Sequence, residues 1–74
     1  MEEFYWKKGD YLQRSEYYVS PEGKVCGELS HNRFDDHWSA RGWNESERHF
    51  ILLGIYISEE KAKTAIEEYC GDHY

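Results

Sequence analysis

Hydrophobic and polar residues change their spacing at Ser58, within the stretch "LLGIYISEEKAKTAIEEY" that runs from Leu52 to Tyr69. Before Ser58, the segment "HFILLGIYI" is rich in β-branched and aromatic residues, which is typical of a strand and favours a central position in a sheet. Gly54 interrupts this segment, and an isolated glycine in a strand indicates a bulge or a close backbone approach. After Ser58 the apolar residues recur at helical spacing. The pattern predicts a strand followed directly by a C-terminal helix.

The predicted helix has a defined start, a defined end and one apolar face. Ser58 can accept hydrogen bonds from the first-turn amides, and the two glutamates after it favour the positive end of the helix dipole. Ile57 is placed to pack against Ala62 across this cap. Gly71 is expected to end the helix. The apolar face combines positions i, i+3, i+4, i+7 and i+8, which are Ala62, Ala65, Ile66, Tyr69 and Cys70.

A β-hairpin is predicted around "SPEG" at residues 20–23. Proline presets the backbone for the first turn position, and Gly23 accepts the positive φ that closes a tight turn. In the second arm Val25, Gly27 and Leu29 alternate with Cys26 and polar residues, which is the period-2 pattern of a strand with one buried face.

The middle of the chain predicts a third strand between two polar loops. "SHNRFDDH", residues 30–37, is rich in turn formers and is interpreted as a long loop. "HWSARGW", residues 37–43, can form a short strand with Trp38 on one face and Arg41 on the other. "NESER", residues 44–48, is interpreted as a second loop.

These elements predict an α+β fold, with an antiparallel sheet of three to five strands and one C-terminal helix packed on one face. No repeat, low-complexity segment or linker divides the chain, so residues 1–74 are expected to form a single domain. A chain of 74 residues is close to the lower limit at which one core offsets chain entropy. The aromatic content of 18% supplies large rings in place of aliphatic bulk.

Charge and hydropathy narrow the classes of partner. The net charge of -6 opposes attraction to nucleic-acid phosphates and to anionic membranes, and it favours a partner with a basic surface. No apolar run approaches the roughly 20 residues that span a bilayer, and the first residues lack the pattern of a signal peptide. The resulting expectation is a cytoplasmic protein.

Reactive side chains lack the spacing of a catalytic or metal site. The histidines and cysteines show no helical pair and no Cys-x-x-Cys motif, so neither a metal nor another cofactor is expected. Neighbouring carboxylates point to different faces, and neither cysteine lies where a nucleophile is activated. Cys26 and Cys70 are expected to be reduced, mostly buried thiols. The sequence therefore predicts a protein without enzymatic activity.

Several of these segments resemble a pattern of small accessory proteins encoded by phages and prophages. An early tryptophan, Trp6, is followed by "GKVCGEL", by "WSA" at Trp38 to Ala40 and by "LGIYISEEKAKTAIEEY". This is similar to the arrangement W-x-A … L-G-x-[YF]-x-S-x-E-x-A-K-x-A-[IV]-E of those proteins, outside the loops at residues 31–37 and 44–48. The resemblance implies an accessory protein that binds and blocks a protein inside the bacterial host, including the nucleases of restriction and CRISPR defence, as an anti-CRISPR does.

The leading hypothesis is a binding protein that inhibits or redirects a host protein through its sheet face and loops. Rings and arginine anchor protein interfaces more often than scattered lysine and glutamate do. The expected contact residues are therefore Asp35, Asp36, Trp38, Arg41, Trp43 and Glu45.

Two alternatives remain open. Aromatic and basic residues alternate between Trp38 and Arg48, and Trp38, Arg41 and Trp43 would form a stacking platform for single-stranded nucleic acid. The chain would otherwise be a small structural protein that associates with itself, for example as a homodimer.

Overall fold

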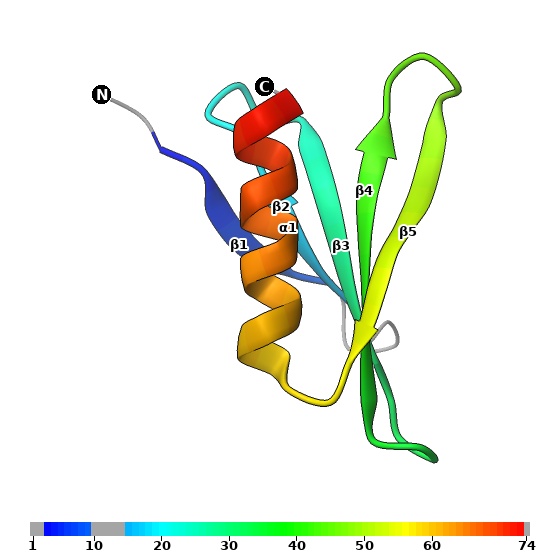
Figure 1. Cartoon of the computed structure of the whole chain (residues 1–74). Coiled ribbons are helices and arrows are strands. Elements are labelled where there is room, and N and C mark those ends of the chain that lie inside the picture. The colour runs from blue at the N-terminus through cyan, green and yellow to red at the C-terminus, as the bar shows by residue number, and fades with distance from the viewer. Residues whose placement is uncertain (1–2, 10–14, 74) are drawn as a thin grey trace.

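The computed structural model describes residues 3–9 and 15–73, which form five strands and one helix (Figure 1). All neighbouring strands pair antiparallel in the order β1-β2-β3-β4-β5, and the helix packs on one face of this sheet. The predicted α+β fold is confirmed. The elements are β1 (Tyr5–Lys8), β2 (Ser15–Val19), β3 (Val25–Asn32), β4 (His37–Asn44), β5 (His49–Tyr56) and α1 (Glu59–His73).

The strand β5 lies at an edge of the sheet, so the prediction of a central position was wrong. Among the described strands it pairs with β4 alone. Part of the apolar composition that predicted a central position lies at the surface instead. Leu52 and Ile55 are 56% and 60% exposed. The central strand is β3, in which Leu29 is almost completely buried.

The predicted irregularity near Gly54 is present as a β-bulge. Ala40 of β4 pairs with Gly54, whereas the next residue, Arg41, pairs with Leu52. Leu53 is therefore the extra residue of β5, and it packs against the hydrophobic core. A bulge increases the local twist of the strand that carries it.

The predicted hairpin at residues 20–23 is confirmed, but the pattern after it is shifted by a second bulge. Gly23 has a φ of 89°, and its N–H donates to the carbonyl of Ser20 at 2.9 Å. Tyr18 pairs with Gly27 while the next residue, Val19, pairs with Val25, so Cys26 is an extra residue. This extra residue places Cys26 in the core and leaves Val25 39% exposed, contrary to the simple alternation.

The two predicted loops are shorter than expected, because β3 and β4 extend into polar sequence. Asn32 and Asn44 precede the turns, and each side-chain oxygen accepts a backbone N–H from within its turn at 3.0 Å. Asp36 and Arg48 end the turns with φ of 54° and 58°. Each asparagine thus supplies the turn chemistry that permits a tight hairpin. The turns are residues 33–36 between β3 and β4, and residues 45–48 between β4 and β5.

The start of α1 follows the prediction, whereas two details at its ends do not. The N–H of Lys61 donates to Oγ of Ser58 at 3.4 Å, as expected for an N-cap. Ile57 is 78% exposed, so it does not cover the cap as predicted, although Ala62 itself is fully buried. The helix also continues through Gly71, which was expected to end it, as far as His73.

The predicted apolar face of α1 packs closely on the sheet. Ala62, Ile66 and Cys70 have no exposed surface. Gly27 and Gly42 lie beneath this face, and a Cβ atom at either position would overlap a side chain of α1. The short distance between helix and sheet therefore depends on small residues in β3 and β4.

A disulfide joins Cys26 of β3 to Cys70 of α1, so the prediction of two reduced thiols was wrong. Their Cα atoms are 6.0 Å apart, although the residues are separated by 44 positions in the sequence. Cys26 reaches the helix because the bulge turns its side chain toward the core. Neither the spacing of the two cysteines nor a local motif predicts this disulfide, because it depends on how two elements that are distant in the sequence pack together.

Candidate binding surface

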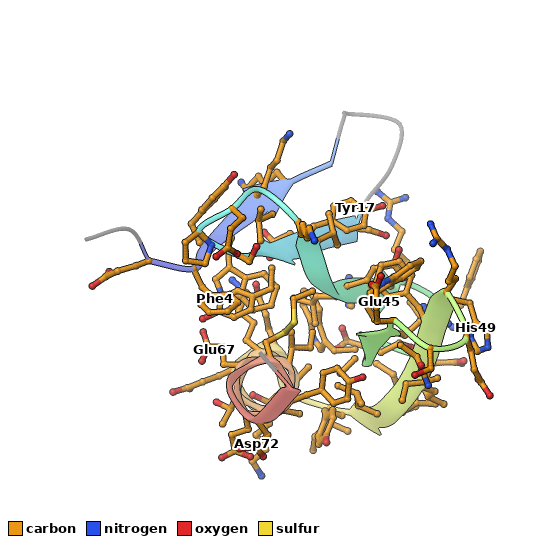
Figure 2. All side chains as sticks on the ribbon, turned by 90° about the horizontal axis from the view of Figure 1, so that it is seen from above. Phe4, Tyr17, Glu45, His49, Glu67 and Asp72 are labelled. Atoms are coloured by element: carbon orange, nitrogen blue, oxygen red, sulfur yellow. A yellow bond between two sulfur atoms is a disulfide. The ribbon has the colours of Figure 1, made fainter. Side chains whose placement is uncertain are left out.

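The face of the sheet opposite α1 has no covering element among the described residues, and we call it the open face. Figure 2 shows Tyr17 and Glu45 on this side, whereas Phe4 lies on the side of α1. Residues whose side chains alternate onto the open face include a set of large apolar groups. They are Tyr17, Val25, Trp43, Phe50, Leu52 and Ile55.

One end of the open face is hollowed into a groove of about 860 Å³, which we call the open-face groove. Its walls combine aromatic rings with charges of both signs, which is the composition of a site that binds a partially apolar ligand or protein segment. The lining residues are Tyr17, Lys24, Val25, Cys26, Trp43, Glu45, Arg48 and Phe50.

Trp43 is held in the groove by three separate contacts. Its indole Nε1 donates to Oε2 of Glu45 at 2.7 Å, and its ring meets Phe50 edge to face with centroids 5.2 Å apart. Its backbone carbonyl accepts a hydrogen bond of 2.8 Å from the hydroxyl of Tyr69 in α1. A ring that is already ordered loses little conformational entropy when a partner binds. Trp43 and Glu45 are both among the contact residues predicted from the sequence.

Arg41 also lies on the open face, but it is paired. Its Nη1 is 3.2 Å from Oε1 of Glu28, the residue directly opposite in β3. The pair is partly buried, which places two opposite charges beside the groove rather than a single cation. An interaction of Arg41 with a phosphate would therefore compete with Glu28.

Trp38 lies on the other face of the sheet from Trp43. It packs against the core on the side of α1 and stacks on His31, with ring centroids 4.2 Å apart. The two tryptophans are five positions apart in one regular strand, so their side chains alternate to opposite faces. The structure therefore does not bring Trp38, Arg41 and Trp43 together as one stacking platform.

Asp35 and Asp36 lie in the turn between β3 and β4, at the opposite end of β4 from Glu45 (Figure 1). Nε2 of His31 and Oδ1 of Asp36 lie at a hydrogen-bond distance of 2.9 Å, and Asp35 accepts a hydrogen bond of 3.4 Å from Asn32. Phe34 at this turn is 99% exposed. The six predicted contact residues thus occupy three places: the open face, the helix side and this turn.

Sequence reasoning missed the apolar residues of β2 and β5 that share the open face with Trp43. The signal was present in "HFILLGIYI", which is apolar at positions that alternate to both faces. The β-branched and aromatic composition of this segment predicts a central strand and does not distinguish its two faces. In an edge strand the same pattern produces an exposed apolar face instead.

Acidic side chains gather on the outer side of α1 rather than on the open face. The groove carries Lys24 and Arg48 against Glu45, so its charges are mixed. The acidic surface therefore lies on the helix side, away from the open-face groove. The exposed acidic residues of α1 are Glu59, Glu60, Glu67, Glu68 and Asp72.

On the helix side, Lys63 and Tyr18 have raised pKa values. Burial alone lowers the pKa of Lys63, but hydrogen bonds and charges of Glu16 and Glu59, both 3.3 Å away, more than offset it. The same ammonium lies 5.1 Å from the Trp6 ring centroid. Burial, followed by the charge of nearby carboxylates, raises the pKa of Tyr18.

These shifts predict a loss of stability at alkaline pH. A pKa that is higher in the folded state means that the folded protein holds its proton more tightly. The contribution is therefore complete below the ordinary values of 10.0 for tyrosine and 10.5 for lysine, and is lost as the pH rises through the folded values. Urea denaturation across this range should show the decline. Tyr18→Phe and Lys63→Met should each make it shallower, and an unchanged slope in both variants would contradict the assignment.

Neither a grouped set of metal ligands nor a membrane-spanning helix is found in residues 3–9 and 15–73. Within these ranges no three potential ligands among histidine, cysteine, aspartate and glutamate are grouped for a metal. Nor does this part of the chain contain a helix with the length and apolar character needed to cross a membrane.

Comparison of the chain with known proteins identifies no related protein. No protein-family model, no curated protein and no solved structure matches the chain.

Proposed function

We propose that this chain is a non-enzymatic binding protein that attaches to a protein of a bacterial host through the open-face groove and thereby inhibits or redirects it. The observation that carries the proposal is Trp43, an ordered ring on an exposed apolar face, with its indole fixed by Glu45 and its edge contact with Phe50. Interfaces concentrate their binding energy in such central aromatic residues.

The resemblance of several segments to the pattern of phage and prophage accessory proteins supports this class of function. Under this proposal the host partner is a defence protein, such as a nuclease complex of restriction or CRISPR immunity, and the protein acts as an anti-CRISPR or a related inhibitor. The net charge of -6 would draw a basic surface of that partner toward the protein, because complementary charge accelerates encounter. The open-face groove would then hold the complex together through its aromatic rings.

The proposed place of action is the cytoplasm of the host, and this sets a condition on the Cys26–Cys70 bridge. Disulfides are rare in that compartment because the thiol pool keeps cysteines reduced. Both cysteines are buried, at 7% and 0% exposure, which limits the access of a reductant to the sulfur atoms. The proposal therefore requires that the bridge survives in the cytoplasm or that the reduced protein still folds.

Truncating the anchor ring tests the proposed site. The tagged protein is used to purify its partner from the host bacterium, and dissociation is then measured with the purified pair by surface plasmon resonance. Trp43→Ala should accelerate dissociation about 30-fold, as expected for an interface hot spot. The matched control is Phe34→Ala, since this exposed ring lies in the turn at the other end of β4 and should leave dissociation unchanged.

Two outcomes would contradict the proposal. One is a Trp43→Ala variant that binds like the wild type while Phe34→Ala weakens the complex. The other is saturable binding of the wild type to a single-stranded oligonucleotide at low salt, weakened by Arg41→Ala, which would favour the nucleic-acid alternative.

A further inference from the structure

The open-face groove lies where two strands of the sheet separate (Figure 1). The last pair between β3 and β4 at this end joins Gly27 to Gly42. β3 nevertheless begins at Val25, and β4 continues to Asn44. The β2–β3 hairpin lines one side of the groove and the β4–β5 hairpin lines the other, and we call these sides the first wall and the second wall. The first wall consists of Tyr17, Lys24, Val25 and Cys26, and the second wall consists of Trp43, Glu45, Arg48 and Phe50.

Two consecutive residues near the C-terminal end of α1 bond to the two walls from the opposite face of the sheet. The disulfide joins Cys70 to Cys26 of the first wall (Figure 2). The hydroxyl of Tyr69 donates a hydrogen bond of 2.8 Å to the backbone carbonyl of Trp43, in the second wall. The end of α1 therefore connects the two walls at the level where the described pairing of β3 with β4 has ended.

Tyr69 positions the backbone from which the Trp43 ring projects. Its own ring packs directly over Gly42, where an added Cβ atom would overlap it. This contact brings the hydroxyl to the carbonyl of the next residue in β4. A partly buried carbonyl needs a donor where strand pairing has ended, and Tyr69 supplies it. Tyr69 is therefore a positioning residue for the ring that anchors the binding site.

The disulfide keeps Tyr69 in this position. Ala62 and Ile66 fix the earlier turns of α1, because both side chains are fully buried in the core. The last turn is fixed by Cys70, directly after Tyr69. A single hydrogen bond at the end of a helix competes with water, and terminal turns open more readily than the rest of a helix. Loss of the bridge would therefore weaken the connection between the walls before it disturbs the rest of α1.

We propose that the last turn of α1 is a redox-sensitive strap that sets the width of the open-face groove. With the bridge intact, the two walls are held together and Trp43 is ordered for binding. When the bridge is reduced, the second wall is free to move relative to the first. The affinity for the partner then falls, because binding must order the groove again. The effect on affinity rests on the proposed function, whereas the effect on the groove does not.

The reductant is a dithiol of the kind that maintains the thiol pool of a cell. One thiolate of the dithiol attacks a sulfur of the bridge, and its second thiol then resolves the mixed disulfide. The dithiol leaves as a disulfide, and Cys26 and Cys70 each become a thiol, so that two electrons and two protons are transferred to the protein. Because the two cysteines are 7% and 0% exposed, this exchange is slow and responds to lasting changes in redox conditions.

The first test needs no partner and follows the indole N–H of Trp43 by NMR in the purified protein. Its signal is assigned with Trp43→Phe. Excess dithiothreitol, at a temperature well below the melting transition of the reduced protein, should accelerate solvent exchange of this N–H about tenfold. Cys26→Ala combined with Cys70→Ala should show the same rate without reductant. The indole N–H of Trp38 is the internal control, because this ring lies at the other end of β4 and should exchange at an unchanged rate.

Tyr69→Phe tests the strap while the bridge is intact. It removes only the hydroxyl that reaches Trp43, so exchange of the Trp43 indole should accelerate about three- to tenfold while the domain remains folded. The matched control is Tyr56→Phe, which removes a hydroxyl at the other end of β5 from the groove and should change nothing. Exchange that responds to neither Tyr69→Phe nor reduction would overturn the proposal. A reduced protein in which Trp38 exchanges as fast as Trp43 would also overturn it, since the bridge would then hold the whole domain.

The second test measures dissociation from the purified host partner of the proposed function by surface plasmon resonance. Cys26→Ala combined with Cys70→Ala should dissociate about tenfold faster than the wild type. Tyr69→Phe should also dissociate faster, whereas Tyr56→Phe should match the wild type. Equal dissociation of all these variants would overturn the effect on binding. If no partner is recovered, the proposed function fails, and the exchange rates of Trp43 alone decide whether the strap exists.

Discussion

Replacing Ile66 by aspartate is expected to abolish the cooperative unfolding transition. Ile66 is fully buried in the face of α1 that packs on the sheet, directly over Gly27. A buried carboxylate without a partner, together with the lost packing, costs more than about 4 kcal/mol. A domain of this length has a total stability of roughly 4–11 kcal/mol, at about 0.05–0.15 kcal/mol per residue.

The matched control variant is Thr64→Asp, which introduces the same charged residue into the same helix. Thr64 belongs to the same helix but is exposed, so aspartate there should change the free energy of unfolding little. Circular dichroism during thermal unfolding distinguishes the two variants. If Ile66→Asp melts cooperatively near the wild-type temperature, α1 does not pack on β3 through this residue.

The sequence was informative about α1 because its signals are local. The cap at Ser58 and the apolar spacing around Ile66 depend only on neighbours within two helical turns. The bulge near Gly54 was predicted for the same reason, since an isolated glycine within an apolar strand usually accompanies a bulge or a close backbone approach.

The position of β5 was not predictable from its composition. The order of strands in a sheet depends on which elements pair with each other. A strand that is apolar on both faces can lie at the centre of a sheet, and it can equally lie at an edge with one apolar face exposed. The disulfide was missed for a related reason. The partners Cys26 and Cys70 meet only once a bulge in β3 and the docking of α1 are both in place.

The candidate site was predicted in part. Trp43, Glu45 and Arg41 lie on one face, whereas Trp38 was grouped with them although the period of a strand already separates it. The walls contributed by Tyr17 and Val25 come from another hairpin, and no local pattern connects them to Trp43.

Removal of the Cys26–Cys70 bridge should have the second large effect on stability. The bridge links residues separated by 44 positions, and closing a loop of that length is worth about 4 kcal/mol in the chain-entropy treatment. For a domain of this size such a loss lowers the melting temperature by about 15–30 °C. Melting the wild-type protein with and without a strong reductant measures the effect.

Cys26→Ala combined with Cys70→Ala is the matched variant for this experiment, because it removes the bridge permanently. It should melt near the reduced wild type and should not respond to reductant. Both cysteines pack in the core, so the variant also loses a small amount of buried surface and should melt slightly lower than the reduced protein. A wild-type melting temperature that is the same with and without reductant would show that α1 is held by packing alone. That result would remove the obstacle to action in a reducing cytoplasm, whereas unfolding on reduction would place the working protein in an oxidising compartment.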